Sequence, residues 1–310
     1  MAAPAPGPPR PPAPYLQERI GTRLAQLGAE RPDLGPALDL QRILLGREVE
    51  LVDVIAGGGL PGLSLPAGYL AAKLGRGIPA LHGEPIPLPG ALLSKGLREF
   101  CGHLDSGGAG QAAGNVSRAL DEGTLESGSL LSACFGRNQQ QVRVIASHHS
   151  LSADILWLAA ELALAPFAYL LALQVLQKAV AANEKVAAAL QAWDCGYCPA
   201  CASWPAIVEA GDGHVLRCSF CATAWALSSY RCLYCSNDTE TFVTAAPDPE
   251  HPGRRLQLCG QCGGYVKVLE TAEPGVFPLL AVEDLASLDL DMAAIERNYI
   301  RPALPEITRK

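Results

Sequence analysis

The chain has 310 residues, 49% of them hydrophobic, and a formal net charge of −7. This length allows two domains with separate cores, and the hydrophobic content is that of a well-packed protein rather than a disordered one. The acidic balance argues against a nucleic-acid partner, because nucleic-acid binding needs a cationic face that releases counterions.

The chain begins with a proline-rich segment, MAAPAPGPPRPPAP. Proline removes backbone donors and favours extended geometry, so residues 1–14 are predicted to form a disordered tail. The segment lacks the apolar core of a secretory signal and is not expected to direct secretion.

Residues 15–193 are predicted to form an all-helical bundle. Leu16, Ile20, Leu24 and Leu27 recur at three- and four-residue steps, which is typical of an amphipathic helix. Further helices are expected over residues 37–55, 91–104, 111–121, 138–147, 152–165 and 167–193. Between them, the proline-rich passage Pro79–Pro89 is predicted to be an irregular loop lying over the bundle.

One segment, Ile155 to Val175, is apolar and about long enough to cross a membrane. However, Glu161 lies within it, Pro166 interrupts it and no cationic flank anchors it. We interpret it as two buried helices broken at Pro166, and we expect no membrane insertion.

At Asp194 the helical periodicity gives way to short strands separated by cysteine pairs. Two hairpins are predicted, one turning at Gly211–Gly213 and one spanning residues 239–258, and each is followed by a single further strand. This repeated layout predicts an α+β multidomain protein, in which tandem rubredoxin-like or zinc-ribbon modules and a C-terminal helix follow the bundle. The expected boundaries are residues 194–231 for the first metal-binding ribbon, 232–275 for the second and 276–310 for the helix and tail.

Eight of the eleven cysteines form four C-x-x-C pairs, which are Cys198/Cys201, Cys218/Cys221, Cys232/Cys235 and Cys259/Cys262. Two thiolates three positions apart hold one edge of a tetrahedral metal, and a second pair closes it. The sequence therefore predicts two four-cysteine metal sites in a protein of a reducing compartment, where thiols stay free. Such sites leave no open position for a substrate, which favours a structural over a catalytic role.

Several features of these sites stay open from the sequence. A hairpin between the members of each neighbouring pair favours neighbour pairing, and an interleaved arrangement is the alternative. Four thiolates suit both zinc and iron. Only Cys262 is followed by the glycine common after such pairs. Cys195 overlaps the first pair and is interpreted as a spare thiol, structural or reactive.

Other candidate residues have simpler explanations. His148 and His149 are expected to mark a helix end, and Cys101 and Cys134 to be buried small hydrophobic residues. The glycine-rich run 107–114 lacks the spacing of a phosphate loop and is interpreted as a linker. A last acidic cluster is expected to be a solvated face or a partner-binding surface, and it contains Glu283, Asp284, Asp289 and Asp291.

Six strings follow one another along the chain: YCPAC, LRCSFCATAW, YRCLYCSN, LCGQCGGYVKVLE, VEDLASLDLD and NYIRP. Taken together, they resemble the formate dehydrogenase accessory (formation) protein family, FdhE. The resemblance runs through most of residues 195–302 and implies a helical domain followed by rubredoxin-like modules. It also implies iron at the eight paired cysteines, which places iron ahead of zinc.

By this resemblance, the protein is expected to be a cytoplasmic assembly factor without catalytic activity of its own. It would bind the catalytic subunit of a respiratory formate dehydrogenase before export and support its maturation. A rubredoxin-like redox protein, acting through iron or through Cys195, is the alternative. A zinc-ribbon nucleic-acid binder is disfavoured by the charge.

Overall fold

The computed structural model describes residues 11–211, 214–246, 251–270, 275–305 and 307. The chain divides into two compact units, and each unit contains segments that are distant in sequence. The helical unit comprises Arg10–Leu63 and Gly83–Leu171, and the cysteine unit includes Ser64–His82 and Ala172–Lys310. The domain boundary predicted at Asp194 thus lies inside the cysteine unit, because two segments from the predicted bundle pack with the cysteine-containing part.

The helical unit consists of amphipathic helices with their apolar stripes buried. They are α1 (Ala13–Glu30), α2 (Gly35–Val54), α4 (Gly90–Leu104), α5 (Gly110–Asp121), α6 (Ser127–Phe135), α7 (Gln139–His148) and α8 (Ala153–Ala172). Helix α1 begins inside the predicted tail, with Pro14 in its first turn, where a missing backbone N–H costs no hydrogen bond. Residues 1–10 of that tail lie outside the described residues. The glycine-rich run 107–114, which was interpreted as a linker, contains the start of α5.

Pro166 does not break its helix, contrary to the prediction, because α8 continues through it to Ala172. The proline removes one backbone donor, but Leu164 and Phe167 beside it are fully buried, and this burial favours one continuous helix. Within the described residues, one helical stretch, Ala153–Ala182, is long and apolar enough to cross a membrane. Because 72% of its most apolar window is buried, it equally fits a core helix of a globular protein.

The predicted final helix of the bundle, residues 167–193, begins inside α8, but its larger part belongs to the cysteine unit and includes α9 (Lys178–Ala182) and α10 (Glu184–Gln191). Asn183 separates them, and its side chain accepts a hydrogen bond from the backbone N–H of Lys185 at 3.0 Å. Helix α10 packs on α3 (Ala67–Gly75), a helix that the sequence analysis did not identify.

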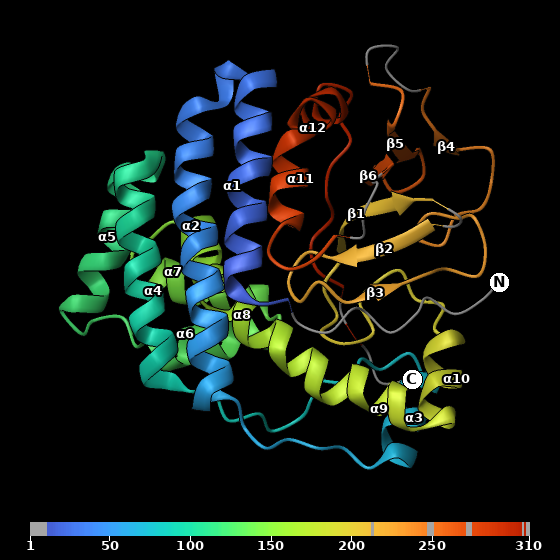
Figure 1. Ribbon diagram of the computed structural model, residues 1–310, viewed down its shortest axis with the longest axis horizontal. Helices are drawn as coiled ribbons and strands as arrows, with labels where there is room; N and C mark the ends of the chain where they lie inside the picture. The colour runs from blue at the N-terminus through green and yellow to red at the C-terminus, as the bar shows by residue number, and fades with distance from the viewer. Residues whose placement is uncertain (1–10, 212–213, 247–250, 271–274, 306, 308–310) are drawn as a thin grey trace. The chain divides into compact units, whose positions relative to one another are not determined.

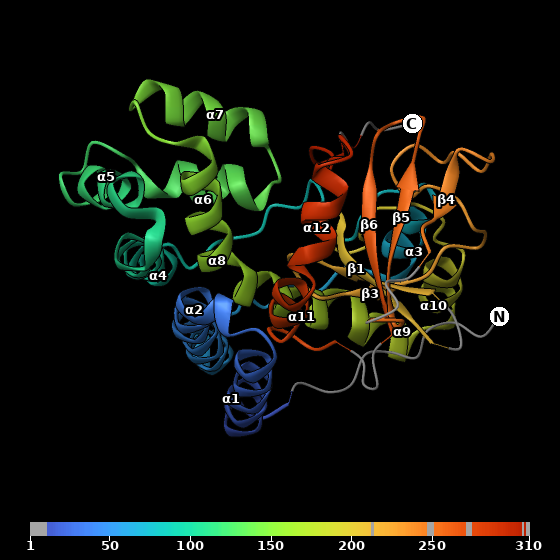
Figure 2. The ribbon, with the colours of Figure 1, turned by 90° about the horizontal axis from the view of Figure 1, so that it is seen from above.

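One six-stranded sheet, rather than two separate ribbons, forms the centre of the cysteine unit (Figures 1 and 2). Its order is β3-β2-β1-β6-β5-β4. The strands are β1 (Pro205–Ala210), β2 (His214–Cys218), β3 (Ala224–Trp225), β4 (Phe242–Thr244), β5 (Arg254–Cys259) and β6 (Tyr265–Glu270). Each predicted ribbon supplies three antiparallel strands, and β1 and β6 join the two halves in parallel, with Val208 opposite Val268. This pairing satisfies the backbone groups of two strands that would otherwise be edges.

Helices α11 (Leu280–Ala286) and α12 (Leu288–Ile295) pack on one face of this sheet (Figure 2). Leu280 packs with Ile207 of β1, and Ala294 packs with Tyr265 of β6. The sequence predicted one helix here, but the helix is interrupted at Ser287, whose hydroxyl donates to the carbonyl of Glu283.

The acidic cluster of these helices is used inside the fold. Lys267, fully buried on β6, lies 2.7 Å from carboxylate oxygens of both Asp284 and Asp291. Arg301 contacts the same two carboxylates at 2.8 and 2.9 Å. Burial opposes ionisation of Asp284, but Arg301 and Lys267 together lower its pKa. These two acids therefore tie the C-terminal helices to the sheet and are not a simply solvated face.

Candidate metal centres

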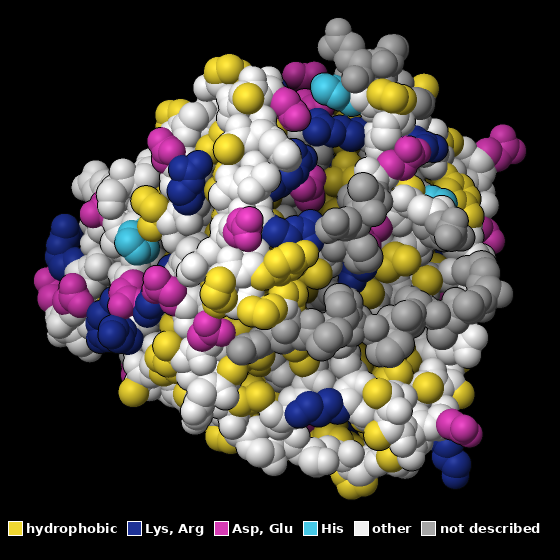
Figure 3. Space-filling view, viewed as in Figure 1, with side chains coloured by type: hydrophobic (Ala, Val, Ile, Leu, Met, Phe, Trp, Pro, Cys, Tyr) yellow, Lys and Arg dark blue, Asp and Glu magenta, His cyan; other side chains and the backbone are white. Residues whose placement is uncertain are grey.

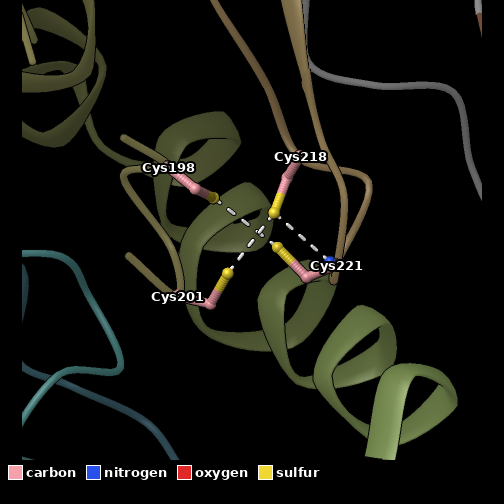
Figure 4. Close-up of side chains that lie close together, drawn as sticks. All are labelled: Cys198, Cys201, Cys218 and Cys221. Carbon is pink, nitrogen blue, oxygen red and sulfur yellow. Dashed lines mark hydrogen bonds between the residues drawn. The ribbon is translucent and has the colours of Figure 1, made fainter. Parts of the chain in front are cut away.

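Four of the predicted cysteine ligands gather in the first half of the sheet, and we name this cluster site one (Figure 4). The sulfur atoms of Cys198 and Cys221 lie 3.6 Å apart, and those of Cys201 and Cys218 lie 3.4 Å apart. All four residues are buried. Their side chains point toward one another from two turns, one that precedes β1 and one that follows β2.

The other four predicted ligands form site two in the second half of the sheet. The sulfur of Cys232 lies 3.7 Å from that of Cys262, and Cys235 and Cys259 are separated by the same distance. Cys235 is exposed and Cys262 half-buried, so site two is more open to solvent than site one. In both sites all four sulfurs lie within 4.8 Å of one another, which is the neighbour arrangement and not the interleaved one.

All four cysteine pairs share one backbone turn. In each turn the N–H after the second cysteine donates to the carbonyl of the first, as Ala222 does to Cys218 at 3.2 Å. The donating residue takes a left-handed conformation in every case, and the φ angles are 73° for Ala202, 55° for Ala222, 62° for Ser236 and 68° for Gly263. The absence of glycine after three of the pairs therefore does not alter the turn.

Hydrogen-bond donors surround sulfur atoms in both sites. In site one, the backbone N–H groups of Phe220 and Cys221 donate to the Cys218 sulfur, both at 3.4 Å. In site two, the Asn237 side-chain amide donates to the Cys259 sulfur at 3.6 Å. Donors of this kind stabilise thiolate ligands and tune a bound metal.

Burial raises the pKa values of Cys198 and Cys218 in site one, and of Cys232 and Cys262 in site two, above the ordinary range. Burial also opposes ionisation of Cys259, but backbone donors and the Asn237 amide outweigh it and lower its pKa to about 6. Site two thus carries a group that favours the thiolate form that metal binding requires.

The donor set of each site fits a tetrahedral metal ion. Four soft sulfur ligands converge from two turns, with backbone donors around them, and this chemistry suits zinc or iron. Cys198, Cys201, Cys218 and Cys221 would hold one ion, and Cys232, Cys235, Cys259 and Cys262 the other. Four sulfur ligands complete a tetrahedron, so such an ion would fix the turns in place and leave no position for a substrate.

The two sites are in direct structural contact. Gly196, next to the first cysteine pair, lies so close to Leu233 of the third pair that an added Cβ would overlap the Leu233 carbonyl. The rings of Trp204 and Tyr234 meet edge to face, with centroids 4.9 Å apart. Sequence patterns gave no indication of this contact, because Gly196 and Trp204 belong to one predicted ribbon and their partners to the other.

The remaining candidate residues lie outside both sites. Cys195 is half-buried and packs near Gly77 of the loop after α3. Cys101 and Cys134 are buried thiols, and burial raises the pKa of Cys101 to about 12. His148 ends α7 and His149 caps it, with their rings 4.8 Å apart.

The start of the predicted irregular loop, at Ala80 and Leu81, lies against the first cysteine turn, whereas the sequence placed the loop over the bundle. The backbone N–H groups of Ala80 and Leu81 donate to the carbonyls of Pro199 and Ala200 at 2.7 and 2.9 Å. These bonds satisfy two buried donors and cover the first cysteine turn.

Comparison with curated proteins identifies FdhE proteins as relatives over part of the chain. A protein named FdhE homolog from Aquifex aeolicus is 30% identical over 124 residues, which cover 38% of this chain and 44% of the relative. The protein named FdhE from Escherichia coli is 32% identical over 114 residues, covering 35% and 36%. The chain thus spans less than half the length of these relatives. No family model matches the chain.

Among solved structures, the crystal structure of the FdhE protein from Pseudomonas aeruginosa is similar over nearly the whole chain. It covers 93% of this chain and 94% of its own, with a TM-score of 0.57 and 23% sequence identity. This likeness confirms the α+β fold, with a helical part followed by a sheet that carries the two four-cysteine clusters.

Proposed function

We propose that this chain is a member of the FdhE family and an accessory protein for the maturation of formate dehydrogenase. It would act in the cytoplasm as a chaperone that binds the catalytic subunit before export. The observation that carries the proposal is the sequence identity to the FdhE proteins of Escherichia coli and Aquifex aeolicus over part of the chain, together with the matching fold.

The surface supports a protein partner over a nucleic acid. Lys and Arg side chains are interspersed with Asp and Glu on the face shown in Figure 3, so this face has no continuous cationic field. We also propose that the protein has no catalytic activity of its own, because closed four-thiolate sites favour a structural role.

We assign iron as the first choice for both sites, on the family resemblance, and zinc as the alternative. The convergence of four sulfurs in each site supports binding of either metal. Metal analysis of the protein from its native host distinguishes them, and two equivalents of zinc with no iron would overturn the assignment of iron.

Gene deletion in the native host tests the accessory role. The deletion strain should lose formate dehydrogenase activity and regain it when the gene is restored. Tagged protein should also capture the catalytic subunit. Unchanged activity in the deletion strain would overturn the accessory role, whereas lost activity without capture would overturn only the binding of this subunit.

A redox function is the second candidate, and the openness of site two supports it. Cys235 reaches the surface, so an iron ion held there would lie near solvent and a reaction partner. A reversible absorption change on reduction is expected if this function is correct. Full restoration of formate dehydrogenase activity by zinc-only protein would exclude it.

A further inference from the structure

The two cysteine sites differ in how far their sulfur ligands are covered. All four cysteines of site one are buried, and the backbone N–H groups of Ala80 and Leu81 bond to carbonyls of its first turn. In site two, Cys235 and Cys262 both reach solvent. Because the oxidation of a cysteine follows its exposure, a solute that diffuses in water attacks site two directly, whereas site one has to open first.

Within site two, one cysteine lies outside the apolar covering. Cys232 and Cys259 are buried in a cluster with Phe242, and Cys262 packs against this cluster. Cys235 is the exposed member of the site and is not part of that cluster in the described chain. The Cys235 sulfur is therefore the ligand that a small solute reaches first.

The charge around Cys235 favours an uncharged oxidant. Asp238 and Glu240 follow it in the same exposed segment, and the four thiolates of the site outweigh the charge of a divalent ion. Arg231 and Arg301 also lie in this half of the unit, but both already form ion pairs with carboxylates. Anionic oxidants are repelled by such surroundings, whereas hydrogen peroxide is small and neutral.

We propose that Cys235 is an oxidation site, where hydrogen peroxide converts site two from a metal centre to a disulfide. The Cys235 thiolate attacks one peroxide oxygen, so an S–O bond forms, the O–O bond breaks and hydroxide leaves. The Cys259 thiolate, whose sulfur lies 3.7 Å away, then attacks the Cys235 sulfur and expels a second hydroxide as the S–S bond forms. The two sulfurs together lose two electrons, which reduce the peroxide, and the ion leaves because two of its ligands are gone.

The new disulfide would join the same two turns that the ion joins. Cys235 lies in the turn before β4, Cys259 ends β5, and these two strands pair with each other. Because a disulfide restricts the unfolded chain, it replaces part of the stabilisation that is lost with the ion. The oxidised protein should therefore keep its sheet and bind the ion again after reduction. This inference goes beyond the proposed accessory role and does not depend on the identity of the client.

Peroxide treatment of the zinc-loaded full chain tests this step without the redox chemistry of iron. Cys195→Ser serves as the parent, because it removes the half-buried thiol outside both sites. A chromogenic chelator should show the first zinc leaving at least about tenfold faster than the second, since only site two is open to solvent. Mass spectrometry should locate a disulfide between Cys235 and Cys259, and dithiothreitol should restore the lost zinc.

Two histidine variants make the test specific. Cys235→His removes the exposed thiol but keeps four ligands, since three cysteines and one histidine are a common zinc set, and it should slow the first release about tenfold. Cys262→His makes the same change at a cysteine packed against the apolar cluster and should release zinc at the parent rate. Zinc content and thermal unfolding identify a variant that fails to load or fold. In that case the disulfide map of the parent decides the result.

Three outcomes would overturn the proposed oxidation site. They are equal rates of zinc loss from both sites of the parent, a disulfide that does not contain Cys235, and equal release by the two loaded histidine variants. A disulfide from Cys235 to Cys232 or Cys262 would overturn Cys259 as the partner and support Cys235 as the oxidised residue.

Discussion

At the residue scale, the turn after each cysteine pair shows how a local sequence preference is overridden. Ala202, Ala222 and Ser236 adopt the left-handed conformation that glycine adopts most readily, as Gly263 does in the fourth turn. The conformation costs an ordinary residue about 1–2 kcal/mol, and metal ligation with the turn's hydrogen bonds offsets this cost.

Ala222→Gly is therefore expected to increase the free energy of unfolding of the metal-loaded protein by about 1 kcal/mol. Denaturant unfolding followed by circular dichroism measures the change. Gly263→Ala is the reverse test and should destabilise by a similar amount, since open space surrounds its Cβ position and only backbone strain acts there. Unchanged stability in both variants would show that the left-handed conformation costs no free energy in the metal-loaded protein.

Glu48 of α2 gives the helical unit a pH dependence. Burial, with a smaller contribution from Glu161, raises the pKa of Glu48 from 4.5 to about 8. Because the folded state binds the proton more tightly than the unfolded state, the stabilisation is complete below pH 4.5 and is lost as pH rises toward 8. The slope in that window is about 1.4 kcal/mol per pH unit.

Glu48→Gln should remove this contribution, so the variant gains stability over wild type as pH rises from 5 to 8. Urea unfolding of the helical signal at several pH values measures the difference. Glu18→Gln on the exposed face of α1 is the control and should leave the pH dependence unchanged. A constant difference between Glu48→Gln and wild type across this window would contradict the raised pKa.

At the scale of elements, the close approach of two cysteine turns holds the halves of the sheet together. Gly196 allows the first turn to contact the backbone of the third, because any side chain there meets the Leu233 carbonyl. Within the first half, Trp225 of β3 holds the same region by donating from its ring nitrogen to the carbonyl of Cys195 at 3.1 Å. Through these contacts the residues beside the first cysteine pair are tied both to β3 and to the third cysteine turn.

Gly196→Ala should destabilise the cysteine unit by about 1–3 kcal/mol, the usual cost of overpacking, because the obstacle is backbone that cannot rotate away. Thermal unfolding of the metal-loaded protein measures the loss. Gly68→Ala on α3, where an added Cβ meets nothing within 4 Å, is the matched control and should be neutral or slightly stabilising. Equal melting temperatures for Gly196→Ala and wild type would show that the two halves separate easily.

At the scale of the whole molecule, the parallel pairing of β1 and β6 couples the two candidate metal centres. β2, which ends at Cys218 of site one, pairs with β1, and β1 pairs in turn with β6. Cys259 of site two lies at the end of β5. Strand β5 pairs with β6 along the edge of β6 that faces away from β1. Loss of the metal from one site is therefore expected to lower the stability of the other site, because the sheet connects them.

Cys218→Ser should remove the metal from site one and also lower the stability of site two, because small metal-stapled folds derive much of their folding energy from the ion. Metal stoichiometry and thermal unfolding, measured on the same sample, report both effects. Cys195→Ser, outside both clusters, should retain two metals and unfold as wild type does. If Cys218→Ser keeps native metal content and stability, site one is not a metal site. If it loses one metal while site two remains fully stable, the sites are independent.

Features that depend on neighbouring residues could be predicted before the structure was known. Helix α4 and strand β6 follow from local periodicity, and the four cysteine turns follow from C-x-x-C spacing. The hairpin between the members of each neighbouring pair also favoured the grouping found in both clusters. These features have short-range causes, so hydrogen bonds and side-chain spacing within a few residues suffice to define them.

Features that depend on distant partners arise only when the chain folds. Pro166 stays inside α8 because its neighbours are buried, and Asp284 and Asp291 turn inward because Lys267 is buried beneath them. The two predicted ribbons become one sheet because β1 and β6, some 60 residues apart in sequence, satisfy each other's backbone groups. No periodicity or spacing in the sequence encodes such contacts, because their free energy comes from burial and pairing between segments that meet only in the folded chain.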